Sequence, residues 1–176
     1  MEFKIVKPSM HYRQSYHDYL TELGNEERYP MPMDLDYRDF PALLQTLNNY
    51  EQGVDLPHQR VPNTTLWLIH NSELVGVANI RHRLNRALAE AGGHIGIGIR
   101  PSYRNQGAGA YLMQASVNRA NSMNISPIQI HCYADNPASQ KLIEKCGGEL
   151  TSQIDIKNAT VLRFNINRLA ASANSL

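Results

Sequence analysis

The apolar positions of the N-terminal third follow one strand pattern and two helix patterns. A short strand is predicted over 3–7. Apolar residues then recur at helical spacing over 9–24, and again from Asp36 or Asp39 to Gly53. Each of these helices has an apolar stripe on one side only. We therefore expect both to cover the face of a sheet.

After position 64 the pattern changes to the two-residue period of strands. The expected elements are a hairpin of strands 65–70 and 74–81, a loop or short helical turn over 86–93, a strand over 95–99, a helix from about 107 to 120, a strand over 128–133, a helix over 138–145, and a last hairpin of strands 150–156 and 160–166. Residues 1–169 are predicted to form a single domain of α/β (α+β) class, and 170–176 a frayed tail.

The segment that joins the strand 95–99 to its helix has the features of an anion site. Gly107 and Gly109 open the helix, and Arg104 places a fixed positive charge beside it. The free N–H groups and dipole of a helix N-terminus attract anions, and glycine lets a ligand approach the backbone closely. The segment is therefore predicted to bind a phosphate-like group.

Arg104-x-x-Gly107-x-Gly109 resembles the pyrophosphate-binding pattern Arg/Gln-x-x-Gly-x-Gly/Ala of the GNAT superfamily of N-acetyltransferases. A second segment, 128–148, resembles the family's strand–Asn–x–x–(Ala/Ser)–helix–Gly unit. The likeness covers roughly 65–167, and 81–96 resembles a bacterial subgroup of predicted acetyltransferases. It implies the GNAT fold, a mixed and mostly antiparallel sheet, flanked by helices, whose central parallel strand pair splays apart.

The resemblance implies acetyl-CoA as the cofactor. In the family the strand that matches 95–99 bulges and splays, and the backbone N–H groups of Ile97 and Ile99 would bind the pantetheine arm and polarise the thioester. The residues implied to wrap the pyrophosphate are Arg104, Asn105, Gln106, Gly107, Ala108 and Gly109. Asn136 and Ser139 would contact the pantetheine, or alternatively cap the following helix.

The catalytic residues are less clearly marked. Ile143 stands where many family members carry a general-acid tyrosine. Tyr133 on the preceding strand is the remaining candidate acid, with burial in the core and protonation by water as alternatives. His94, at the start of the central strand, is the predicted general base because its ordinary pKa is near neutrality, and a solvent-facing strand residue is the alternative. His82 and Glu90 are weaker candidates for the base.

Two acceptor classes remain open. Acidic and aromatic residues between 26 and 37, Tyr29 among them, suit a cationic, polyamine-like amine. Arg81 or Arg83 suits the carboxylate of an amino-acid-like acceptor, since a guanidinium binds carboxylates in a bidentate manner. The expected function is transfer of an acetyl group from acetyl-CoA to a primary amine of a small molecule or peptide by direct attack. A non-catalytic acyl-CoA-binding or regulatory module is the alternative, and a nucleotide-binding module a more distant one.

Composition narrows the partners. The 176 residues carry a net charge of +1, which gives no basis for binding nucleic acid or an anionic membrane. No apolar run approaches the roughly 20 residues of a membrane span, and no signal-peptide pattern is present, so a cytoplasmic protein is predicted. Cys132 and Cys146 are expected to be reduced, buried thiols, and no metal site is predicted. The terminal hairpin offers an edge for a possible homodimer.

Overall fold

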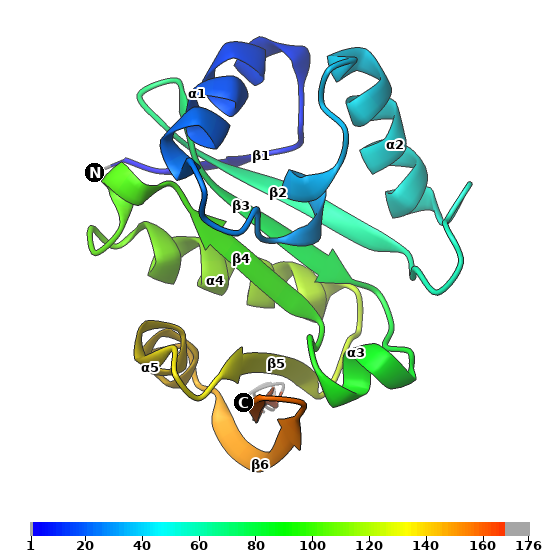
Figure 1. The fold of residues 1–176 in the computed structure, drawn as a ribbon, viewed down its shortest axis with the longest axis vertical. Coiled ribbons are helices and arrows are strands. Elements are labelled where there is room, and N and C mark those ends of the chain that lie inside the picture. Colours follow the sequence, from blue (N-terminus) through cyan, green and yellow to red (C-terminus); the bar gives the residue numbers. More distant parts are fainter. Residues whose placement is uncertain (1, 168–176) are drawn as a thin grey trace, which may run out of the picture.

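Two antiparallel sheets that meet at one junction form the centre of the protein (Figure 1). The computed structural model describes residues 2–167, so the tail predicted over 170–176 and the domain end at 169 lie outside the described residues. The first sheet has the order β1 (Lys4–Val6), β2 (Asn63–His70), β3 (Glu73–Arg81) and β4 (Ile95–Ile99). The second has the order β5 (Ile128–Tyr133), β7 (Ala159–Ile166) and β6 (Glu149–Ile156).

Helices cover both faces of the first sheet (Figure 1). The elements outside the sheets are the α-helices α1 (Arg13–Leu23), α2 (Phe40–Gln52), α3 (Arg86–Glu90), α4 (Ala108–Ser122) and α5 (Pro137–Lys145), and the short 3-10 helices η1 (Met10–Tyr12), η2 (Met31–Asp34) and η3 (Pro101–Tyr103). α1 and α2 pack on one face and α4 on the other.

This sandwich explains why β2 is a continuous apolar run. Neighbouring residues of a strand point to opposite faces. Leu66 and Leu68 therefore join the cluster under α4, whereas Trp67 and Ile69 join the cluster under α1 and α2. Both faces bury apolar area, and this burial stabilises the fold by roughly 25 cal/mol per Å².

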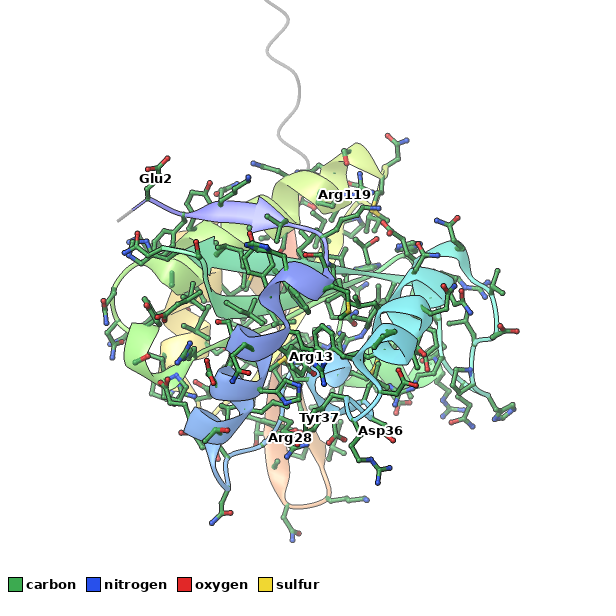
Figure 2. The ribbon with its side chains drawn as sticks, turned by 90° about the horizontal axis from the view of Figure 1, so that it is seen from above. Glu2, Arg13, Arg28, Asp36, Tyr37 and Arg119 are labelled. Carbon is green, nitrogen blue, oxygen red and sulfur yellow. The ribbon has the colours of Figure 1, made fainter. Side chains whose placement is uncertain are left out.

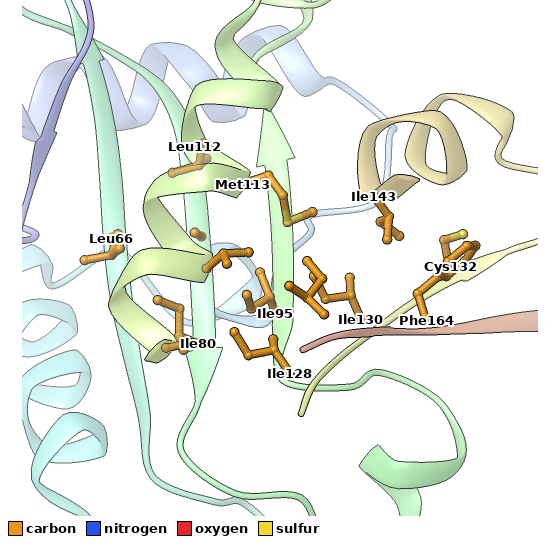
Figure 3. Close-up of a cluster of buried hydrophobic side chains, with 14 of the residues drawn as sticks. Leu66, Ile80, Ile95, Leu112, Met113, Ile128, Ile130, Cys132, Ile143 and Phe164 are labelled. Carbon is orange, nitrogen blue, oxygen red and sulfur yellow. The ribbon is translucent and has the colours of Figure 1, made fainter. Parts of the chain in front are cut away.

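The cluster under α4 extends into the second sheet (Figure 3). Leu112 and Met113 of α4 share it with Ile95 of β4, and also with Ile130 of β5 and Phe164 of β7. All five side chains are at most 2% exposed. The two sheets thus have one common core even where their strands separate.

The junction itself consists of two hydrogen bonds and a close backbone approach. The N–H of His94 donates to the carbonyl of Gln129 at 2.6 Å, and the N–H of Gln129 donates to Nδ1 of His94 at 3.0 Å. Gly93 forms a β-bridge with Ile130. Within residues 2–167, β4 and β5 pair only there, so the splayed strand pair that the sequence predicted is present.

The expectation that the strand 95–99 bulges is wrong. Register between β3 and β4 runs without a shift from Ile80 opposite Ile95 to Gly76 opposite Ile99. The gap forms because β5 departs from β4, and not because β4 is distorted.

The structure shows which residue caps α2 and places the start of α1 later than predicted. Asp39, and not Asp36, caps α2, and its carboxylate accepts the N–H of Ala42 at 3.0 Å. Ser9 makes no side-chain capping bond, and α1 begins at Arg13 after a 3-10 turn.

We expect Gly93→Ala to destabilise the protein by about 3 kcal/mol. At φ +67° the added Cβ would lie 2.5 Å from the carbonyl oxygen of Gln129, a backbone atom that cannot move without opening the junction. Gly147→Ala is the matched control, because Gly147 has φ +89° but open space around the added Cβ, and should cost about 1 kcal/mol. Urea unfolding measures both, and equal losses would contradict the steric role of the junction.

Candidate functional site

A cavity of about 670 Å³ lies in the gap between β4 and β5. Its walls are β4, residues 130–133 of β5 and the beginning of α5. The segment between α1 and α2 contributes Glu26, Glu27 and Tyr29. The volume is within the range of pockets that hold small molecules and cofactors.

The backbone N–H groups of Ile97 and Ile99 point into this gap. At the two ends of the strand, the carbonyl of His94 accepts a hydrogen bond from β3 at 2.7 Å, and the N–H of Arg100 donates one to β3 at 2.9 Å. Positions that face the partner strand alternate with positions that face away in an antiparallel pair. Positions 95, 97 and 99 therefore face away from β3, toward the separated β5. Outward donors at these positions are what the predicted pantetheine contacts require.

Tyr29 lies directly against the face of β4 that carries Gly96 and Gly98. A Cβ at Gly96 would collide with the Tyr29 hydroxyl, and one at Gly98 with the Tyr29 carbonyl. The glycines of β4 thus admit the segment between α1 and α2, and any side chain there would push that segment away. The sequence analysis placed Tyr29 at the acceptor but did not anticipate this contact.

The predicted pyrophosphate loop presents unused donors. Gly107 caps α4 at φ +88°, and no side chain caps the helix. The first helical bond is from the N–H of Tyr111 to the carbonyl of Gly107 at 3.0 Å, so the N–H groups of 108–110 have no partner within the helix. Residues 104–107 are exposed, and the first turn of α4 holds no acidic residue.

Two carboxylates of α1 and the following loop hold this region in place. Glu26 forms a bidentate pair with the guanidinium of Arg104, at 2.6 and 3.2 Å, and that hydrogen bonding lowers the pKa of Glu26. Glu22 accepts from Arg100 and from the N–H of Ser102, both at 2.5 Å. Burial acts to raise the pKa of Glu22, but these bonds outweigh it and the pKa lies below its usual range.

His94, the predicted general base, forms the hydrogen bonds that join β4 to β5 at the junction. Its Nδ1 already accepts the N–H of Gln129, and its side chain is not part of the cavity wall. Burial, with a smaller contribution from the charge of Arg81, lowers its pKa to about 4. The catalytic role stays a prediction that this geometry does not favour.

Tyr133 lies at the end of β5, lines the cavity and is 54% exposed. Its hydroxyl is therefore accessible, and the alternative of burial in the core is wrong. Ile143 is fully buried in the common core, so α5 offers no acid at that position. The thiol of Cys132 is buried, and burial raises its pKa. Burial also raises the pKa of Cys146.

The side-chain oxygen of Asn136 caps α5 by accepting the N–H of Ser139 at 3.0 Å. Both residues also line the cavity. The two alternatives considered for them are thus compatible in space, and the capping one is present.

Arg81 is 9% exposed and lines the cavity close to the junction. Its Nη1 donates to the carbonyls of Gly92 and Gly93, at 3.2 and 2.9 Å. Sequence reasoning missed several wall residues, of which Tyr19 and His131 have titratable side chains. In the sequence, Tyr19 has the spacing of a core residue of α1, so only the folded structure shows that it lines the cavity. Burial raises the pKa of its hydroxyl.

Beyond the cavity, the described residues contain neither a metal cluster nor a membrane-spanning helix. Among residues 2–167, no group of three or more His, Cys, Asp or Glu side chains is placed to hold a metal ion. None of the helices in this range combines the length and the apolar character that crossing a membrane requires.

Comparison with known proteins places this geometry in a family context. The family model described as Acetyltransferase (GNAT) family matches residues 18–148. A search of curated proteins finds no match to the sequence.

Solved structures of similar fold cover nearly the whole chain. The microcin C7 self-immunity acetyltransferase MccE, in complex with acetyl-CoA and AMP, has a TM-score of 0.67 at 15% identity over 95% of this chain and 93% of that one. A chimera of the spermidine N-acetyltransferase SpeG from Vibrio cholerae and hSSAT has 0.62 at 16%, over 95% and 96%. yncA from Salmonella typhimurium, with its cofactor acetyl-CoA, has 0.60 at 14%, over 98% of both chains. At these identities the likeness establishes the fold.

The low pKa of His94 predicts acid-sensitive stability. The unfolded chain takes up a proton near pH 6.5, whereas the folded protein does so only near pH 4. The free energy of unfolding therefore falls as the pH drops through this window, by about 2 kcal/mol between pH 7 and pH 5 for this residue alone. In His94→Asn, whose amide oxygen can still accept the Gln129 N–H, we expect the pH 7 to pH 5 loss to shrink by that amount.

The control for this experiment is His58→Asn, since His58 lies in an exposed loop. Denaturant unfolding at both pH values should give the wild-type loss for this variant. An unchanged pH dependence in His94→Asn would contradict the buried, neutral imidazole.

Proposed function

The chain belongs to the acetyltransferase (GNAT) family, and on that premise we propose that it transfers the acetyl group of acetyl-CoA to a primary amine of a small molecule or peptide. One observation carries the proposal. The outward N–H groups of β4 line a cavity between β4 and β5, and the chain that leaves β4 leads to the uncapped N-terminus of α4.

The described residues fit acetyl-CoA. We assign the pyrophosphate to the segment 104–109, in which 104–107 are exposed and free N–H groups and the α4 dipole attract an anion. The pantetheine would extend along β4 against the N–H groups of Ile97 and Ile99, with Asn136 and Ser139 on the opposite wall. The cofactor supplies an acetyl group activated as a thioester.

The chain's own groups then have two tasks. The N–H groups of β4 stabilise the negative charge that develops on the carbonyl oxygen as the neutral amine forms the new C–N bond. The C–S bond breaks, and the Tyr133 hydroxyl gives its proton to the departing thiolate. The amine releases its own proton to solvent, and Tyr133 regains one there because its side chain is exposed.

Transfer through a cysteine is disfavoured. The thiolate is the nucleophilic form of cysteine, and burial raises the pKa of Cys132, the cysteine that lines the cavity. This supports direct attack of the amine on the thioester.

A second copy of the chain is a further proposed partner. β6 is the outer strand of its sheet, and most of its side chains are exposed. An unpaired edge of this kind is a ready surface for another strand, so the homodimer stays a prediction, together with the cytoplasmic location.

We expect Gly107→Glu to abolish acetyl-CoA binding. The new carboxylate would project from the cap of α4 into the anion site and repel the pyrophosphate. Thermal stability with acetyl-CoA, CoA, NAD or ATP measures the effect, because ligand at 100 times its dissociation constant adds about 2.7 kcal/mol. Gly147→Glu has the same positive φ and equally open surroundings at the end of α5, and should keep the wild-type response. A shift that survives in Gly107→Glu, or a larger shift with NAD or ATP, contradicts the assignment.

We expect Tyr133→Phe to lower kcat about 100-fold in release of CoA thiol with an amine, while KM for acetyl-CoA changes little. Tyr111→Phe is the control, since Tyr111 is 45% exposed on α4 and contacts the ring of Phe3 instead. A loss in Tyr19→Phe, with Tyr133→Phe unaffected, would move the acid to α1. Binding of acetyl-CoA without thiol release for any amine would favour the non-catalytic acyl-CoA-binding module.

A further inference from the structure

The part of the cavity next to the junction is basic, and the described part of the chain offers no counter-ion for its charge. Arg81 forms no ion pair with any Asp or Glu among residues 2–167, and its bonds are to the carbonyls of Gly92 and Gly93. Arg81 is also buried, with 9% of its surface exposed. A buried charge that lacks a counter-ion is costly, so this position favours an anionic ligand.

A second donor in the cavity wall lacks an acceptor. The Nδ1 atom of His131 accepts the N–H of Gly92 at 3.1 Å, so the proton of the neutral ring is on Nε2. That Nε2 is buried and has no hydrogen-bond partner in the described part of the chain. An unmade bond to a buried donor costs free energy that a ligand oxygen would recover.

A second arginine, Arg163, adds positive charge near His131. Arg163 stands opposite His131 in the β5–β7 register, and its bonds are to the Ser152 hydroxyl at 2.9 Å and the Ala89 carbonyl at 3.5 Å. Burial, then the charges of Arg163 and Arg81, lowers the pKa of His131 to about 4.

The acidic residues near the acceptor side do not offset this charge. The Asp36 carboxylate pairs with Arg38 at 2.7 Å, and Asp36, Arg28 and Tyr37 lie together beside α1 and α2 (Figure 2). Glu26 is engaged by Arg104. Glu27 is then the wall carboxylate that no ion pair among the described residues engages.

We propose that Arg81 and His131 form a subsite for a carboxylate of the acceptor. The acceptor is then an amino acid or another amine that carries a carboxylate, with Glu27 as the wall group that suits its ammonium end. A polyamine would place a further positive charge against Arg81, which has no counter-ion among residues 2–167. The inference rests on the proposed acetyl transfer and decides between the two acceptor classes that the sequence left open.

The test compares amines that differ only in this group. CoA thiol release is measured with a panel of amino acids, their carboxamides and spermidine. We expect kcat/KM for the best amino acid to exceed that for its carboxamide about 100-fold. In Arg81→Gln, which removes the charge and keeps a shorter polar side chain, the amino-acid rate should fall about 100-fold and the carboxamide rate should change little. Arg83, the other arginine that the sequence offered for the carboxylate, is exposed and does not line the cavity. Arg83→Gln therefore removes an equal charge from outside the site and should stay within twofold of wild type.

Binding provides a readout without turnover. With CoA present, the N-acetylated form of the best amino acid should shift the ¹⁵N resonance of His131 Nε2, and its carboxamide should not. If Arg81→Gln does not fold, which the loss of its acetyl-CoA-induced thermal shift would reveal, His131→Asn replaces it. That variant keeps an acceptor for the Gly92 N–H, removes the Nε2 donor and should lose about tenfold in kcat/KM.

The outcomes separate the two proposals. Equal or better turnover of the carboxamide or spermidine overturns the carboxylate subsite and leaves acetyl transfer standing. Turnover of no amine overturns acetyl transfer, and the His131 resonance, with the common amino acids and their carboxamides as probes, then decides the subsite alone. A shift specific for the carboxylate supports it, and no shift overturns it.

Discussion

The hydrogen-bonded contact between His94 and Gln129 is the constraint on which the cavity depends. It joins β4 to β5 at their starts, while the common core under α4 keeps both sheets in one body (Figure 3). Beyond the junction, the edge of β4 that faces away from β3 has outward N–H groups and no paired strand within residues 2–167. Backbone donors require partners, so this separation creates an unsatisfied edge inside the molecule, and a ligand that brings acceptors along the strand completes it.

The glycines around β4 have different physical purposes. Gly96 and Gly98 keep one face of the strand bare, so that Tyr29 and its neighbours can lie on it. Gly107 has a positive φ that turns the chain into α4 and leaves the N–H groups beyond it uncapped. The ion pair between Glu26 and Arg104 connects these two regions. Through it, the loop expected to contact the acceptor and the loop expected to hold the pyrophosphate are positioned together.

Charge is distributed unevenly along the cavity. The charges of Arg81 and Arg163 give the end beside the junction its positive potential, and Glu26 and Glu27 lie in the segment between α1 and α2 that lines the cavity. Since low-dielectric walls strengthen such fields, the distribution orients a molecule that carries both charges. Burial, with a smaller contribution from these arginine charges, lowers the pKa of both His94 and His131 to about 4. Both rings are therefore neutral near pH 7 and act as hydrogen-bond donors or acceptors and not as proton carriers.

The order and type of the elements could be predicted from the amino-acid sequence, because the spacing of apolar residues indicates which faces are buried. The sequence also identified the glycine-rich entry to α4 and the separated strand pair, the first from local chain geometry and the second from resemblance. Four features became clear only from the folded protein: Tyr29 lies on β4, Nδ1 of His94 accepts the Gln129 N–H, Tyr133 is exposed, and Arg81 is buried without a counter-ion among residues 2–167. Each of these depends on contacts between residues far apart in the chain, and local periodicity contains no information about which distant backbone or charge a side chain will meet.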